Sequence, residues 1–160
     1  PHIYGDIKVK DEKEVKKNWE LLKLKEENKT VLSGVPKGLP SIVKAQRIQE
    51  KASGVGFDWK SIEKVWGKVQ EEMIELQTEV EKKNIEKIEN EFGDLLFSLI
   101  NYARFLKISP DTSLERTNQK FINRFNYIEQ KAKKEGIKIN EMSLSKMESI
   151  WTEAKSHLFN

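Results

Sequence analysis

The segment 62–80 repeats apolar residues at intervals of three and four, and this repeat constrains the fold more than any other feature. Its apolar members are Ile62, Val65, Trp66, Val69, Met73, Leu76 and Val80. An α-helix has 3.6 residues per turn, so this spacing places the apolar side chains on one helix face. We therefore predict a long helix to about Lys83, N-capped by Asp58 or Ser61, with the apolar face as a bundle seam.

The rest of the chain also indicates helices, separated by short breaks. The expected helices cover 11–28, 41–53, 85–107, about 110–135 and 143–158. Ser41 is expected to cap the second of these, and Gly54 and Gly56 to end it. Residues 31–40 hold two Gly and two Pro and indicate a linker, whereas 1–10 indicate an extended lead-in. No segment alternates apolar and polar residues with a period of two, so we predict an all-α fold. We expect the chain to divide into 1–39, which holds the lead-in, the amphipathic helix and the linker, and a helical domain at 40–160.

The composition bounds the classes of function. With 160 residues and a net charge of +3, the chain fits one compact domain, and its acids and bases alternate, so a broad nucleic-acid footprint is not indicated. The absence of cysteine excludes disulfides and thiolate metal sites and fits a cytoplasmic location. No apolar run is long enough to span a membrane, so a membrane partner is not expected.

Two acidic pairs lie beside the apolar stripes. Glu72 and Glu75 are three residues apart in one helix, and Glu91 and Asp94 are three apart in the next, so each pair projects from one helix face. A short turn between helices favours antiparallel packing, which lets the two pairs face each other, while Glu71 points away from the seam. Four carboxylates beside apolar surface repel one another unless a cation compensates them, and oxygen ligands favour Mg²⁺ or Mn²⁺.

Other interpretations of these acids differ in what they require. Ordinary solvated charges, paired with the many nearby lysines, would form a surface without function. A di-iron bundle needs Glu-x-x-His pairs, and a zinc site needs histidine or cysteine ligands, but His2 and His157 lie in no such motif. The sequence therefore favours a hard-cation site of carboxylates, with solvated charge as its competitor.

Basic and aromatic residues supply candidate contacts for a polyphosphate. Lys120 and Arg124 lie four residues apart on one helix face, and Phe121 and Phe125 form a second stripe expected to anchor that helix in the core. Trp151 is either a core residue or a platform for a base. Phe57 and Trp59 are likewise either core residues or platforms for a base. Lys68 and Lys87 could either offset the charge of the acids or contact phosphate.

Taken together, these segments resemble the MazG family of nucleoside triphosphate pyrophosphohydrolases, specifically the C-terminal half of two-domain bacterial members. The signature E-E-x-x-E followed by E-x-x-D is present at 71–75 and 91–94. The resemblance covers nearly the whole chain and is carried by residues 1–6, 34–36, 39–40, 47–52, 55–59, 71–75, 91–97 and 120–125. The family's N-terminal repeat is absent, and Pro1 stands where that repeat would end, so we expect a chain without the family's first domain.

The resemblance implies a dimeric all-α bundle in which 40–160 is the catalytic domain. It implies Mg²⁺-dependent hydrolysis of a nucleoside triphosphate to the monophosphate and pyrophosphate, a role in clearing nucleotide pools, and a homodimer as partner. By similarity, the metal ligands are Glu72, Glu75, Glu91 and Asp94, with Glu71 supporting the site or orienting water. The implied phosphate contacts are Lys68, Lys87, Lys120 and Arg124, and Trp151 lines the nucleotide pocket.

Two alternatives stay open at this point. One is a related all-α pyrophosphohydrolase with a narrow substrate such as dUTP, dCTP or phosphoribosyl-ATP, which shares the acidic motif. The other is a helical interaction module without catalysis, in which the helix at 11–28 binds a partner helix. The interaction module needs no divalent ion, so a metal-binding measurement distinguishes it from both kinds of enzyme. A panel of nucleotide substrates distinguishes the two enzymes from each other.

Overall fold

The computed structural model describes residues 12–27 and 30–157, and within those ranges it is entirely helical. The elements are α1 (Glu12–Glu27), α2 (Ser41–Gly54), α3 (Ile62–Lys82), α4 (Ile85–Phe105), α5 (Pro110–Lys134), the 3₁₀ helix η1 (Ile139–Glu141) and α6 (Leu144–His157). The all-α prediction is confirmed. The predicted lead-in at 1–10 lies outside the described residues. The chain forms two compact units, 1–110 and 111–160, so a single catalytic domain at 40–160 stays a prediction.

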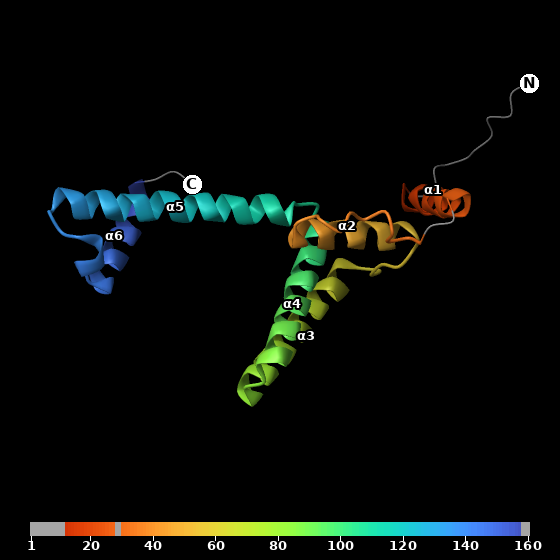
Figure 1. The fold of residues 1–160 in the computed structure, drawn as a ribbon, viewed down its shortest axis with the longest axis horizontal. Helices are drawn as coiled ribbons and strands as arrows, with labels where there is room; N and C mark the ends of the chain where they lie inside the picture. Colours follow the sequence, from red (N-terminus) through yellow and green to blue (C-terminus); the bar gives the residue numbers. More distant parts are fainter. Residues whose placement is uncertain (1–11, 28–29, 158–160) are drawn as a thin grey trace, which may run out of the picture. The chain divides into compact units, whose positions relative to one another are not determined.

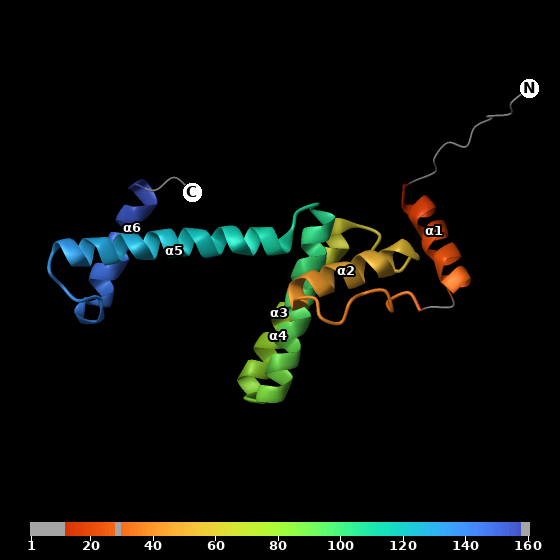
Figure 2. The same ribbon diagram turned by 45° about the horizontal axis from the view of Figure 1, so that its top comes forward.

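Helices α3 and α4 form a hairpin that dominates the first unit (Figures 1 and 2). Lys83 ends α3 in the left-handed conformation with φ 58°, and Asn84 caps α4 by accepting the backbone N–H of Lys87 at 3.2 Å. Because only two residues connect them, the helices pack antiparallel along their length. Trp66 and Tyr102 meet between the helices, with ring centroids 5.1 Å apart.

The buried face of α3 differs from the predicted seam. Val65 and Val69 are each 1% exposed, as predicted, but Met73 and Val80 are exposed, and Glu72 is buried in their place. The reason is the position of α4, which covers the side of α3 that carries Val65, Val69 and Glu72. Val65 and Val69 therefore confirm the seam prediction, whereas Trp66, Met73 and Val80 are exposed within this single chain.

Helix α2 contacts α4 (Figure 2), and the loop that follows α2 carries Asp58 and Trp59. Its N-cap is Pro40 rather than Ser41, and no side chain caps this helix end, so the prediction of Ser41 as the cap was wrong. Helix α3 is capped by Ser61, which accepts the N–H of Lys64 at 3.4 Å, because the Asp58 carboxylate is already paired with another residue. Gly56 follows α2 with φ 95°, which allows the chain to turn there.

Helix α1 contacts α2, and an ion pair of 3.3 Å between Glu20 and Lys51 links the two helices. Three apolar side chains of this helix, Val15, Trp19 and Leu22, are exposed. No helix among the described residues is both long enough and apolar enough to cross a membrane.

The second unit contains most of α5 together with η1 and α6. Its core consists of Ile128, Ala132, Met142 and Ile150, with Phe125 and Trp151 packed against them. Gly136 follows α5 with φ 66°, and the helix ends at Lys134, within one residue of the predicted end at about 135. Phe121 is exposed, so the predicted anchoring of α5 in the core by both phenylalanines holds for Phe125 alone.

Candidate active site

The α3–α4 hairpin brings three of the predicted metal ligands together. One carboxylate oxygen each from Glu72, Glu91 and Asp94 lie within 4.8 Å of one another. Glu72 comes from the buried face of α3, whereas the i,i+3 spacing of α4 presents Glu91 and Asp94 side by side. Antiparallel packing therefore converts two short motifs into a single group of three acids.

Two buried oxygens in this cluster have no hydrogen-bond partner. Oε2 of Glu72 and Oε2 of Glu91 are both buried and unpaired, and Glu72 as a whole is only 5% exposed. Buried carboxylate oxygens are normally paired, because an unpaired one loses its hydration without compensation. The donor set is all carboxylate oxygen, which suits a hard divalent cation, so the residues present fit such an ion.

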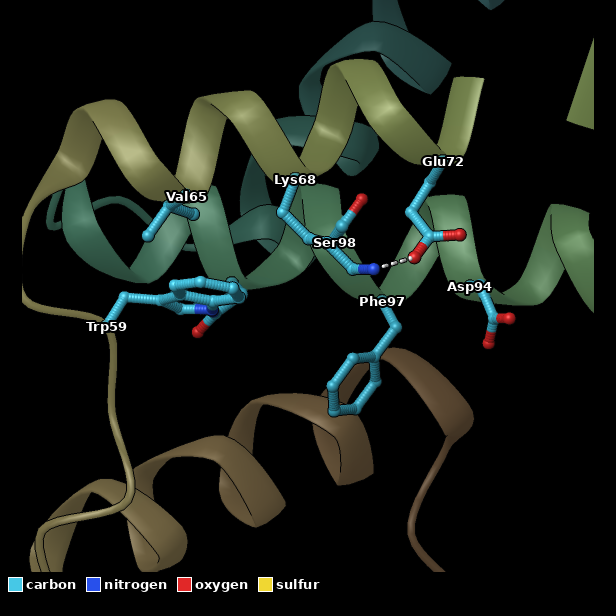
Figure 3. Close-up of a pocket in the computed structure, with 8 residues that line it drawn as sticks. Trp59, Val65, Lys68, Glu72, Asp94, Phe97 and Ser98 are labelled. Atoms are coloured by element: carbon cyan, nitrogen blue, oxygen red, sulfur yellow. Dashed lines mark ion pairs between the residues drawn. The ribbon is translucent and has the colours of Figure 1, made fainter. Parts of the chain in front are cut away.

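Lys68 supplies part of the compensation. Its Nζ lies 2.8 Å from Oε1 of Glu72 and 3.3 Å from Oε1 of Glu71, and Figure 3 shows the ammonium reaching the Glu72 carboxylate. The hydrogen bond to Glu72, followed by the one to Glu71, raises the pKa of Lys68. The ammonium therefore neutralises one side of Glu72 and leaves Oε2 available to a cation. Glu71 is exposed, as the helical periodicity predicted.

Glu75 lies next to the cluster of three acids. The charge of Glu72 raises the pKa of Glu75, and partial loss of hydration, a hydrogen bond with Glu72 and the charge of Glu91 add to the effect. These influences place Glu75 close to Glu72 and Glu91, although its oxygens are not part of the group within 4.8 Å. Glu75 is thus positioned as a further acid beside the other three.

A cavity of about 310 Å³ opens beside these acids. Glu72 and Lys68 line it from α3, Asp94 and Phe97 from α4, and Trp59 from the preceding loop. Figure 3 shows the two acids at one end and the rings of Trp59 and Phe97 on the side nearer α2. The cavity therefore offers charge at one end and apolar surface at the other.

Sequence reasoning missed the ion pair that holds Trp59 at this cavity. Arg104 binds the Asp58 carboxylate with both terminal nitrogens, at 2.5 and 3.1 Å, and also donates to Oδ1 of Asn101 at 2.9 and 3.1 Å. Burial raises the pKa of Asp58, but the hydrogen bonds and charge of Arg104, with the Trp59 N–H, outweigh it and leave that pKa below its usual value. No sequence spacing links positions 58 and 104, so nothing in the sequence signalled this pair.

The other residues predicted to contact phosphate or the nucleotide are not found beside the acids of the first unit. Lys87 is exposed in the first turn of α4. Lys120, Arg124 and Trp151 belong to the second unit, where the Arg124 guanidinium lies 5.4 Å from the Trp151 ring centroid. Nε of Arg124 is buried without a partner. Within the second unit, Arg124 therefore places a positive charge and an unpaired N–H donor near the ring of Trp151.

The fold and the cluster define a class: an all-α protein whose helical hairpin carries carboxylates able to hold a divalent cation. Residues 60–128 match the MazG nucleotide pyrophosphohydrolase domain, a span that includes the whole hairpin. Residues 60–128 of the chain are therefore a MazG domain, as the motifs at 71–75 and 91–94 predicted.

Curated relatives agree with this assignment. Over 158 residues the chain is 39% identical to the nucleoside triphosphate pyrophosphohydrolase/pyrophosphatase MazG of Thermotoga maritima, covering 97% of this chain and 59% of that protein. Over 161 residues it is 34% identical to the nucleoside triphosphate pyrophosphohydrolase of Escherichia coli, covering 97% and 61%. It is also 48% identical over 159 residues to the uncharacterized protein YabN of Bacillus subtilis, covering 97% of this chain and 32% of YabN. The chain thus spans less than two thirds of each relative.

Proposed function

We propose that this chain is a Mg²⁺-dependent nucleoside triphosphate pyrophosphohydrolase, which converts a nucleoside triphosphate and water to the monophosphate and pyrophosphate. The observation that carries the proposal is the group of Glu72, Glu91 and Asp94, which holds two unpaired buried oxygens beside a cavity. A solvated surface would leave no such oxygens buried, and an interaction module would have no use for them. The relatives named for this activity support the same conclusion.

The cation would be held by Glu72, Glu91 and Asp94, with Glu75 as a fourth ligand. Mg²⁺ suits carboxylate oxygens, and Mn²⁺ is its expected substitute. When bound, the ion supplies positive charge for phosphate oxygens and makes a water more acidic. Placing this charge between the acids also removes the repulsion that raises the pKa of Glu75.

The chain's own residues would then bind and orient the reactants. Water attacks the α-phosphorus, the bond from that phosphorus to the bridging oxygen breaks, and pyrophosphate leaves with the electron pair. Glu71 would orient the water or support the ligands, and Lys68, which pairs with Glu72 in this structure, would contact a phosphate oxygen. Lys87, Lys120 and Arg124 stabilise charge on the β and γ phosphates, and Trp151 lines the nucleotide pocket.

A homodimer and a cytoplasmic location complete the proposal. Helices α3 and α4 expose apolar side chains that a second copy would cover: Met73, Ile74, Val80, Ile85, Phe92, Leu96 and Leu99. A large exposed apolar surface marks an interaction site. Met73 and Val80 belong to the predicted seam of α3, but the single chain leaves them exposed. A second copy that covers α3 would bury them.

Matched variants test the proposal. Asp94→Asn and Glu72→Gln should reduce Mg²⁺-dependent release of pyrophosphate by at least about 100-fold, because each removes charge from the ion site. Glu89→Gln, an exposed residue of the same helix as Asp94, should leave the rate unchanged. Titration calorimetry should show weaker Mg²⁺ binding in the first two variants alone. An Asp94→Asn protein that hydrolyses nucleotide at the wild-type rate would show that the site is wrongly assigned.

A further inference from the structure

Helix α1 is attached to α2 chiefly by one ion pair. Among the α1 side chains that the structure describes, Glu20 alone is not exposed. Both oxygens of its carboxylate accept from Nζ of Lys51, on α2, at 3.3 Å, and the two side chains are 17% and 18% exposed. Val15 and Trp19, by contrast, each keep more than half of their surface exposed. The described side chains therefore hold α1 by charge and not by an apolar seam.

This attachment lies at the end of α2, where two glycines allow α1 to come close. Gly54, the last residue of α2, is buried, and a Cβ atom there would lie 3.2 Å from Cγ of Glu20. Lys17, three residues before Glu20 and on the same face of α1, reaches past the end of α2. Its Nζ lies 3.0 Å from the position of a Cβ atom on Gly56. Helix α1 thus rests on the turn that follows α2 as well as on α2 itself.

The turn beneath α1 leads into the loop beside the acids. The backbone N–H groups of Gly56 and Phe57 donate to the carbonyl oxygens of Ser53 and Ala52, each at 3.0 Å. Three residues after Gly56, Trp59 lines the cavity that holds the acids. Because the turn fixes where this loop begins, a helix that rests on the turn can influence one wall of the cavity.

We propose that α1 is a detachable strap on the turn at 54–57. When α1 is docked through Glu20, the turn stays closed; when α1 is released, the turn and the loop that leads to Trp59 open. A partly exposed ion pair holds a helix less firmly than buried apolar surface does, so α1 leaves while α3 and α4 stay folded. The inference goes beyond the proposed function, because it concerns how one wall of the cavity opens and not which reaction takes place there.

Amide hydrogen exchange of the whole chain tests the strap in the wild-type protein. Relative to their intrinsic rates, the amides of α1 should exchange on the order of 100-fold faster than those in the middle of α4, because release of α1 is a local opening. The amides of Gly56 and Phe57 should be no better protected than those of α1, because the turn opens whenever the strap leaves.

Variants of the ion pair provide the second part of the test. Glu20→Gln keeps the side-chain shape but removes the charge, so exchange in α1 and at Gly56 and Phe57 should rise by about tenfold. Exchange in the middle of α4 should not change. Glu14→Gln, at an exposed position of the same helix, should leave all these rates as they are. Glu20→Lys combined with Lys51→Glu should restore the protection, because it rebuilds the ion pair with its charges reversed.

Each other outcome would overturn the inference. If the wild-type turn is far better protected than α1, it stays closed without the strap, and this comparison needs no variant to fold. If Glu20→Gln leaves exchange at Gly56 and Phe57 unchanged, the ion pair does not hold the turn. If the same variant raises exchange throughout α4, α1 is part of the fold and not detachable. Release of pyrophosphate is measured separately, so the strap and the proposed function can each fail alone.

Discussion

The ion pair between Asp58 and Arg104 connects the stability of the first unit to the shape of the site. The Asp58→Asn substitution keeps the side-chain shape and the acceptor for the Trp59 N–H, but removes the charge and one of the two oxygens that accept from Arg104. Because the loop that carries Trp59 is tied to α4 through this pair, its loss should also loosen the wall of the cavity.

The magnitude follows from the geometry of the pair. Hydrogen bonds to charged groups contribute about 1.5–3 kcal/mol each, and breaking a fully buried pair costs about 3–5 kcal/mol. The side chains of Arg104 and Asp58 are 18% and 14% exposed, so solvent screens the pair in part. We expect Asp58→Asn to reduce the free energy of unfolding by about 2 kcal/mol, which lowers Tm by roughly 10 °C in a unit of this size.

The effect should depend on pH in a defined direction. The folded state lowers the pKa of Asp58, so its contribution is fully present above the unfolded pKa of about 4 and is lost as pH falls through the folded value. The difference in stability between wild type and Asp58→Asn should therefore stay constant from about pH 5 to 7 and shrink below about pH 4.

Urea unfolding followed by circular dichroism at several pH values measures this difference. Asp111→Asn, the same substitution at an exposed position, serves as control and should change the stability by less than about 1 kcal/mol. A loss under about 0.5 kcal/mol for Asp58→Asn, or a loss that is undiminished at pH 3, would refute the reasoning, because the pair would then contribute nothing that depends on the ionised carboxylate.

Three further predictions concern the ion, the core and the assembly. Mg²⁺ at 100 times its dissociation constant should stabilise the wild-type protein by about 2.7 kcal/mol, and thermal unfolding should show a much smaller increase for Asp94→Asn at that concentration; an equal increase would contradict the ligand assignment. In urea titrations, Val69→Ala should lower the free energy of unfolding by about 2 kcal/mol, whereas Val15→Ala, at an exposed position, should change it by less than about 0.5 kcal/mol. Equal effects of the two substitutions would contradict the burial described for α3. Ile74→Glu should convert a dimer to a monomer in sedimentation experiments if α3 forms the subunit contact, and an unchanged dimer would place the contact elsewhere.

The sequence predicted the helices well because their signals are local. Apolar repeats at intervals of three and four, and the short breaks between them, each act within a few residues, and the structure confirms the helices that they predicted. The meeting of Glu72 with Glu91 and Asp94 could also be anticipated, because a two-residue connection forces the helices to pack against each other.

Features that depend on distant packing could not be predicted. Asp58 looked like a helix cap, and only the position of α4 shows that it pairs with Arg104 instead. Gln49 lies within a motif that resembles the family, yet its side chain donates a hydrogen bond to the backbone oxygen of Phe97, which is 48 residues away, and no local pattern signals that contact. The exposure of Met73 follows from which side of α3 the second helix covers, and the apolar repeat alone does not specify that side.

The most direct test of the proposed activity is hydrolysis of nucleoside triphosphates in ¹⁸O-labelled water, with and without Mg²⁺, followed by mass analysis of both products. The panel should include dUTP and dCTP, so that a narrow substrate range is recognised in the same experiment. We predict a labelled monophosphate and unlabelled pyrophosphate, formed only when Mg²⁺ is present, because water attacks the α-phosphorus at the ion site. A nucleoside diphosphate with labelled phosphate, or equal rates without metal, would contradict the proposed function.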